Sequence, residues 1–150
     1  MRRVAAIACF LIALAGLPAG AVEFDTTDWY QGANGFEQAA QLAKESGKPL
    51  FVYFRTDWCP YCKQFERELL SSDQVQRFFE EIVAVTINPE LGPDENRIAA
   101  AYSVRGFPAI FVHPVEGQPR QVRRTVMRDG GVGLQTPDEF VATLTRATGE

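Results

Sequence analysis

The chain has 150 residues, 46% of them hydrophobic and 23% charged, which is typical of one globular domain with a core of its own. Its formal net charge is −4 and it has no basic run, so the sequence gives no reason to expect nucleic acid or an anionic membrane surface as a partner. No repeat or low-complexity tract divides it.

The first 21 residues have the pattern of a secretory signal peptide. Met1-Arg2-Arg3 is basic, Val4 to Leu17 is uncharged and apolar, and Ala19-Gly20-Ala21 offers small residues to a signal peptidase. An uncleaved membrane anchor is the alternative, although the apolar run is short for a bilayer span. We therefore expect a signal peptide over 1–21, a mature domain over 22–150, and secretion across the inner membrane into the periplasm.

Cleavage after Ala21 would change the cysteine count and the charge. Cys9 would be lost, leaving only Cys59 and Cys62, and the formal net charge would become 13 − 19 = −6. Two cysteines in an oxidising compartment usually form a stabilising disulfide. A disulfide between these two would close a very small loop, and stabilisation by loop closure grows with loop length. The pair is therefore poorly placed to hold a fold together.

The first half of the mature chain alternates helical and strand patterns. Asn34, with Glu37 three residues later, resembles a helix start, and Gly47 and Pro49 end that helix. The next elements expected are a strand buried on both faces over 50–54, a helix over 63–70, a short helix from 73 to 79, and a β-branched strand over 82–87.

The second half continues the alternation and ends on a well-marked helix. We expect a helix over 93–102, a strand over 109–112, a turn at 118–119 and a strand over 121–127. Thr136 fits the N-cap of the last helix, with Pro137 at its first position and Glu139 closing a capping box. The order of elements predicts an α/β fold in which helices flank a mixed central sheet.

Cys59 falls where a buried strand is followed by a helix. The first amide groups of a helix have no internal acceptor and carry partial positive charge, so a thiolate is stabilised there, and the thiolate is the nucleophilic form. Pro60 suits the first helical turn. Cys62 lies one helical turn later, so its sulfur can reach Cys59. This placement favours a thiol pair that opens and closes as a disulfide.

Two other functions for the pair were weighed. A structural zinc site usually takes four protein ligands, whereas the sequence offers one Cys-x-x-Cys and a single histidine, His113, which we expect in an exposed loop. No metal site or cofactor is therefore expected. An inert staple is disfavoured by the small loop. A module that holds a soft metal such as Cu(I) between the two sulfurs stays open as an alternative.

The chain resembles the thioredoxin superfamily. Trp58-Cys59-Pro60-Tyr61-Cys62 is similar to its active site, and Val104-Arg105-Gly106-Phe107-Pro108 is similar to its second signature, a loop with a cis-proline beside the cysteines. The resemblance runs from about Phe36 to Leu144. Further segments are similar to the periplasmic thioredoxin-like domain that ends the DsbD electron carrier and to its single-domain secreted relatives: Gly47-Lys48-Pro49-Leu50, Asp57-Trp58-Cys59 and Lys63-Gln64-Phe65-Glu66.

The resemblance implies a thioredoxin-like fold and a partner-binding surface around Cys59. A cis Pro108 would leave the backbone of Phe107 free to pair with an extended partner segment, since a proline opening a strand donates no ladder hydrogen bond. An ordinary trans turn proline is the alternative. Trp58, Tyr61 and Phe107 would form an apolar collar around Cys59, unless Trp58 packs against the domain and leaves only Tyr61 exposed.

One position departs from the family pattern. Many thioredoxins carry a buried aspartate six residues before the first cysteine, where this chain has Tyr53, a poor proton acceptor at neutral pH. Glu66 is the candidate replacement, because it lies one helical turn after Cys62 and matches a glutamate of the DsbD-like domain. A solvated surface ion pair is the alternative role for Glu66. Four arginines (Arg120, Arg123, Arg124 and Arg128) are expected on a solvated strand face.

The sequence thus predicts a secreted thiol–disulfide oxidoreductase in which Cys59 attacks and Cys62 resolves. Its expected partners are protein disulfides and thiols of secreted proteins and, by the resemblance, a membrane electron donor of the DsbD type. Reduction of partner disulfides is the favoured direction, with disulfide oxidation or isomerisation as the alternative, because potentials in the superfamily range from about −270 to −120 mV.

Overall fold

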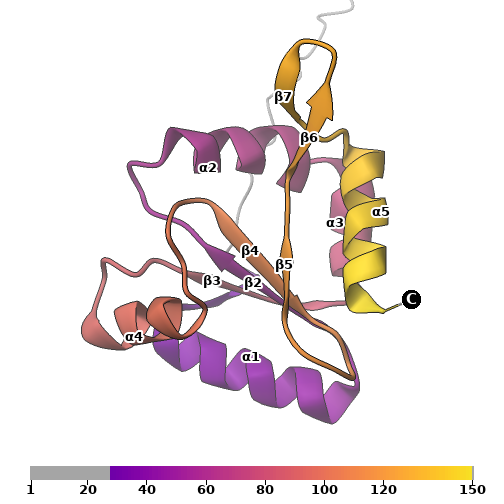
Figure 1. The fold of residues 1–150 in the computed structure, drawn as a ribbon. Coiled ribbons are helices and arrows are strands. Elements are labelled where there is room, and N and C mark those ends of the chain that lie inside the picture. Colours follow the sequence, from indigo (N-terminus) through magenta and orange to yellow (C-terminus); the bar gives the residue numbers. More distant parts are fainter. Residues whose placement is uncertain (1–27, 150) are drawn as a thin grey trace, which may run out of the picture.

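A five-stranded mixed sheet forms the centre of the computed structural model, which describes residues 28–149 (Figure 1). Its strands lie in the order β1-β3-β2-β4-β5. β1, β3 and β2 run parallel, whereas β4 is antiparallel to β2 and β5 is antiparallel to β4. The bounds are β1 Tyr30–Gln31, β2 Leu50–Phe54, β3 Val83–Ile87, β4 Ala109–His113 and β5 Arg120–Val122.

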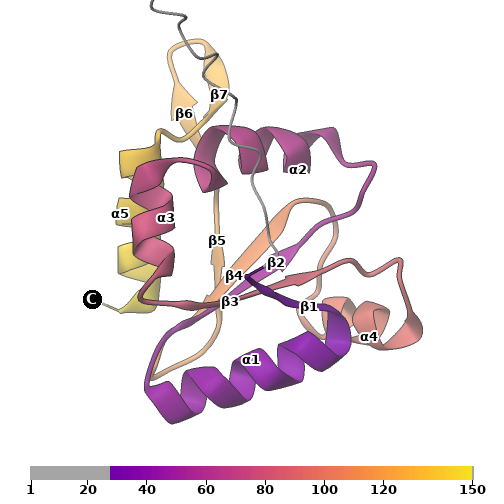
Figure 2. The same cartoon turned by 180° about the vertical axis from the view of Figure 1, so that it is seen from behind.

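Helices cover both faces of this sheet (Figures 1 and 2). One face carries α1 and α4, and the other carries α2, α3 and α5. A π-helical segment, η1, continues α2. The bounds are α1 Gly32–Ser46, α2 Pro60–Phe65, η1 Glu66–Leu70, α3 Asp73–Phe79, α4 Pro93–Ala101 and α5 Pro137–Thr148. The predicted α/β thioredoxin-like architecture, a mixed sheet flanked by helices, is confirmed.

A hydrophobic core lies on each face of the sheet, and β2 contributes to both. Its five residues are all buried, and their side chains alternate between the two faces. Leu50, Val52 and Phe54 pack with α1 and α4. Phe51 and Tyr53 pack with α2, α3 and α5, in the same core as both cysteines. The chain reaches the cysteine pair shortly after the end of β2, and Phe51 and Tyr53 share a core with that pair.

The helix starts were predicted with mixed success. α1 begins at Gly32, two residues before the expected Asn34, and its N-cap Gln31 makes no side-chain capping bond. Its expected end is confirmed, since Gly47 adopts the left-handed conformation, at a φ of 65°, that favours glycine. α5 has the full capping box, in which Thr136 and Glu139 bond each other's backbone amides.

The expected single strand over 121–127 is wrong. The chain breaks after β5, and β6 (Thr125–Arg128) pairs with β7 (Gly131–Leu134) in a separate two-stranded hairpin that projects beyond the sheet (Figure 1). Asp129-Gly130 forms the two-residue turn, a pair that favours tight hairpins. That dipeptide was the signal from which the hairpin could have been predicted.

His113 is not the exposed loop residue that was expected. It ends β4 opposite Leu50, is half-buried, and its Nε2 shares a hydrogen bond with the hydroxyl of Tyr102. Burial lowers the pKa of its imidazole. None of the helices in residues 28–149 combines the length and apolar character that crossing a bilayer requires. The expected signal peptide, 1–21, lies outside the described residues.

Candidate active site

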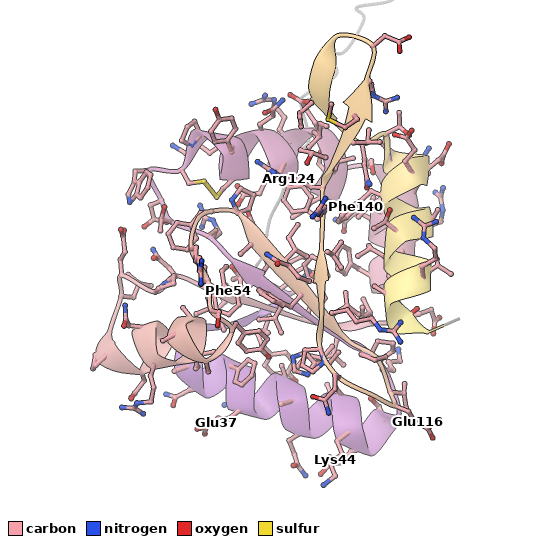
Figure 3. The ribbon with its side chains drawn as sticks, in the orientation of Figure 1. Glu37, Lys44, Phe54, Glu116, Arg124 and Phe140 are labelled. Carbon is pink, nitrogen blue, oxygen red and sulfur yellow. A yellow bond between two sulfur atoms is a disulfide. The ribbon has the colours of Figure 1, made fainter. Side chains whose placement is uncertain are left out.

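Cys59 and Cys62 form a disulfide at the junction of β2 and α2, with their Cα atoms 5.3 Å apart (Figure 3). Cys59 is the N-cap of α2 and Pro60 is the first helical residue, as expected. The Cys62 amide N–H donates to the Cys59 sulfur at 3.1 Å. An otherwise unsatisfied helix-start amide thus points at Cys59, which favours negative charge on that sulfur when the disulfide opens.

The two cysteines differ in exposure. Cys62 has no exposed surface, whereas Cys59 keeps 2% of its surface exposed between the exposed residues Trp58 and Pro60. Both cysteines are therefore buried in this oxidised form, and Cys59 is the less buried of the two. Cys59 is less accessible than the sequence predicted.

The second signature loop lies beside the cysteine pair. The Phe107–Pro108 peptide bond is cis, as the resemblance implies, and β4 begins at the next residue. The Phe107 ring meets the Trp58 ring edge to face, with centroids 6.4 Å apart. Trp58 and Tyr61 are 64% and 61% exposed, so the alternative in which Trp58 packs into the domain is wrong. Trp58 and Phe107 of the expected collar are thus in contact, and Trp58 and Tyr61 are exposed, whereas the collar around Cys59 stays a prediction.

These observations can now be set beside known proteins. Residues 36–148 match the thioredoxin-like domain family. The chain belongs to this family. Its strand order, the Cys-Pro-Tyr-Cys disulfide and the cis-proline loop are therefore features of a thioredoxin-like domain.

The similar proteins include much longer ones. The thiol:disulfide interchange protein DsbD of Ralstonia nicotianae is 27% identical over 114 residues, which make up 75% of this chain but 18% of that protein. DsbD of Klebsiella pneumoniae is 29% identical over 113 residues, 65% of this chain and 19% of that protein. The chain therefore spans less than a fifth of the length of these two relatives.

Solved structures share the fold at low sequence identity. A thioredoxin from Thermus thermophilus aligns with a TM-score of 0.59 at 27% identity, covering 79% of this chain and 84% of that one. The oxidised C-terminal domain of Neisseria meningitidis DsbD has the same TM-score at 18% identity and covers 79% of this chain and 98% of that domain. The second match supports the fold alone.

Glu66 of this thioredoxin-like domain lies in a polar network with Tyr53 and Arg55. Its carboxylate accepts a hydrogen bond from the Tyr53 hydroxyl at 2.9 Å, and its Oε1 lies 2.9 Å from Nε of Arg55, which also approaches Asp57 at 3.5 Å. The Glu66 side chain is 16% exposed, so it takes part in an ion pair but is not the solvated surface group of the alternative. Burial and the Glu66 charge raise the pKa of Tyr53, which keeps its hydroxyl protonated.

The four arginines are not on one solvated face, contrary to the prediction. Arg120 donates to the backbone carbonyls of Arg146 and Ala147 at the end of α5. Arg128 pairs with Glu139. Arg124, labelled in Figure 3, is partly buried. It lies over the Tyr61 ring, and only Arg123 is an exposed side chain without a partner among the described residues.

Three residues around the site were missed by sequence reasoning. Arg55 pairs with Glu66, Glu90 accepts a hydrogen bond from the Trp58 indole at 3.0 Å, and Arg124 lies over the Tyr61 ring. Arg55 lies four residues before Cys59, and this proximity was a usable signal. Nothing local in the sequence marks the other two, since each comes to the site from a different element.

Proposed function

We propose that this chain is a secreted thiol–disulfide oxidoreductase that reduces disulfide bonds in partner proteins. The observation that carries the proposal is the Cys59–Cys62 disulfide at the start of α2, with a helix-start amide donating to the less buried sulfur. The thioredoxin-like family membership and the similarity to thiol:disulfide interchange proteins support it.

The reaction is written from the reduced pair. The Cys59 thiolate attacks one sulfur of a partner disulfide, the partner's S–S bond breaks, and its other sulfur leaves as a thiolate. Cys62 then loses its proton and attacks Cys59, which forms the Cys59–Cys62 disulfide and releases the second partner sulfur. The partner gains two electrons and, after protonation, two protons. Regeneration needs a dithiol donor, for which a membrane electron donor of the DsbD type is the candidate.

We assign supporting roles to four residues of the site. Phe107 and Pro108 would position the partner segment beside Cys59, and Trp58 and Tyr61 would pack against it. The support is the cis peptide bond, the edge-to-face contact of Trp58 with Phe107, and the exposure of both collar rings.

Glu66 would take the proton that Cys62 loses. The support is that Glu66 follows Cys62 by one helical turn and that its side chain is largely buried, where Tyr53 donates to it. Glu66→Gln should slow release of the partner from the mixed disulfide about 100-fold or more, the lower end of the effect of a positioned proton acceptor. Glu68→Gln, an exposed change of the same charge two residues later, is the matched control. Equal rates in Glu66→Gln and wild type would remove this role.

Cysteine substitutions test the proposed reaction itself. Cys59→Ser should abolish reduction of insulin disulfides, whereas Cys62→Ser should accumulate a stable mixed disulfide that is seen by nonreducing electrophoresis and mass spectrometry. Full activity in Cys59→Ser would contradict the mechanism. Stoichiometric Cu(I) on the purified wild-type protein, together with no insulin reduction, would instead favour a metal-binding module.

Secretion is a proposal that rests on the sequence of residues 1–21. Expression of the full chain in a Gram-negative bacterium should yield a periplasmic protein whose N-terminus is Val22. N-terminal sequencing of the periplasmic fraction checks this. An intact Met1 on protein that stays in the cytoplasm would contradict it.

A further inference from the structure

Arg124 lies beside the helix that begins after Cys59. Its guanidinium carbon lies 5.8 Å from the centroid of the Tyr61 ring, in the first turn of α2. β4 and β5 pair Ile110 with Val122 in antiparallel register. Because Val122 ends β5 opposite Ile110, Arg124 follows β5 at the end of the sheet where β4 begins after Pro108. Arg124 therefore lies beside the cysteine helix, at the end of the sheet where the cis-proline loop enters it.

The charge of Arg124 is not balanced within the part of the chain that the structure describes. The side chain is partly buried, and burial lowers the pKa of its guanidinium. No carboxylate of residues 28–149 lies within ion-pair distance of it, whereas Arg55 pairs with Glu66 and Arg128 with Glu139. A partly buried cation is usually paired, so Arg124 offers a place for an anion.

The acids nearest the site are already engaged. Glu66 is bound by Tyr53 and Arg55, Asp57 by Arg55, and Glu90 by the Trp58 indole. The Arg124 guanidinium lies over the Tyr61 ring, and its N–H groups donate to no acceptor in residues 28–149, so they remain available as donors. Planar guanidinium edges match carboxylates in bidentate pairs.

We propose that Arg124 determines specificity by binding a carboxylate, from an Asp or Glu beside the cysteine that Cys59 attacks, in the partner protein. The inference rests on the proposed function, because it concerns the partner of the same sulfur. Exposed Trp58 and Tyr61 would hold the apolar part of such a segment, and Arg124 would select its charge.

Two blocked peptides test the selection. Each carries one cysteine as a thiopyridyl mixed disulfide, and they differ only in Glu or Gln next to that cysteine, so the side chain is the sole carboxylate. The reduced wild-type protein should release pyridinethione from the Glu peptide about 10-fold faster, a ratio equivalent to one well-formed charged contact. The ratio should fall as salt is added.

Substitutions then assign the preference to Arg124. Arg124→Gln should bring the ratio of the two rates close to one, and Arg124→Lys, which keeps the charge without the planar fork, should leave an intermediate ratio. Arg123→Gln is the matched control, since it removes the same charge from the neighbouring exposed position and should retain the wild-type ratio. Circular dichroism checks that each variant is folded.

The outcomes separate this inference from the proposed function. Equal wild-type rates with both peptides, or a ratio that survives in folded Arg124→Gln and Arg124→Lys, would overturn the role of Arg124 while leaving the oxidoreductase in place. Loss of the ratio in Arg123→Gln as well would show a general charge effect and would also overturn it. A reduced protein inert toward both peptides would overturn the oxidoreductase itself.

Discussion

Tyr53 lies in the core that contains both cysteines and binds the charged pair of Glu66 and Arg55. Its ring packs edge to face against Phe65 of α2, and its hydroxyl donates to Glu66. Burial and the neighbouring Glu66 charge raise the pKa of the phenol above its usual value near 10. Removing the proton inside the fold would leave two negative charges side by side, so Tyr53 is a hydrogen-bond donor here and not a base.

The raised pKa of Tyr53 predicts a stability change in alkali. A group whose folded pKa exceeds its unfolded value stabilises the fold fully below the unfolded value, about pH 10, and loses that contribution as the pH rises. Above about pH 10 the free energy of unfolding should fall by up to about 1.4 kcal/mol per pH unit from this residue. Urea unfolding of Tyr53→Phe should show a correspondingly shallower decline.

Tyr102 provides a comparison for that experiment. Burial raises its pKa as well, so Tyr102→Phe should also flatten the alkaline decline of the unfolding free energy. Unfolding curves of Tyr53→Phe that follow the wild type from pH 8 to pH 11 would contradict the assignment of a buried, protonated Tyr53.

Among the site residues, the sequence predicted those whose signals are local. Cys59, Cys62 and Glu66 lie within two helical turns, and the cis Pro108 belongs to a recognisable motif. Arg124 and Glu90 could not be predicted, because their places beside Tyr61 and Trp58 depend on strand register and on a loop after another strand. Long-range contacts of this kind are absent from the periodicity that sequence reasoning uses.

Strands were predicted correctly where their burial determines the hydrophobic pattern of the sequence. β2 and β3 are fully buried runs, apolar throughout in β2 and apolar except for Thr86 in β3, and both were predicted to within one residue. β1 has two residues and no periodicity, so no strand was predicted there. η1 was predicted as an ordinary helix, since composition does not distinguish π-helical from α-helical hydrogen bonding.

Helix capping gives a prediction at this scale. In α5 the Thr136 side chain accepts from the Glu139 amide, whereas in α3 the N-cap Ser72 makes no capping bond and donates to the Leu69 carbonyl instead. Thr136→Ala should therefore lower the free energy of unfolding by about 1 kcal/mol, and Ser72→Ala by clearly less. Chemical denaturation measures both, and equal losses would contradict the capping assignment.

Of the two hydrophobic cores of the molecule, one contains both cysteines and the other lies on the opposite face of the sheet. Phe140 of α5, labelled in Figure 3, is fully buried. Its ring meets the Phe65 ring edge to face with the centroids 5.3 Å apart, within the core that contains both cysteines. Phe111 of β4 is buried in the opposite core with α1 and α4. Cores are densely packed, so a smaller side chain at Phe140 should leave a void beside α2. That void should change how the core holds the Cys59–Cys62 disulfide in place.

Matched core substitutions test this difference. Phe140→Leu and Phe111→Leu should both lower the free energy of unfolding, by less than the roughly 3–5 kcal/mol typical of Phe→Ala. Only Phe140→Leu should also shift the reduction potential of the cysteine pair, on the order of 10–30 mV. Redox titration of both variants measures the shift, and equal shifts would show that the two cores do not differ in this way.

The reduction potential of the Cys59–Cys62 pair tests the central claim most directly. The purified mature domain is equilibrated in thiol–disulfide buffers, and the oxidised fraction is counted by alkylation and mass spectrometry. The proposed reductant should show one two-electron transition near the reducing end of the superfamily range, about −270 mV. A midpoint close to about −120 mV would contradict the reducing role, and cysteines that do not titrate as a pair would contradict the oxidoreductase itself.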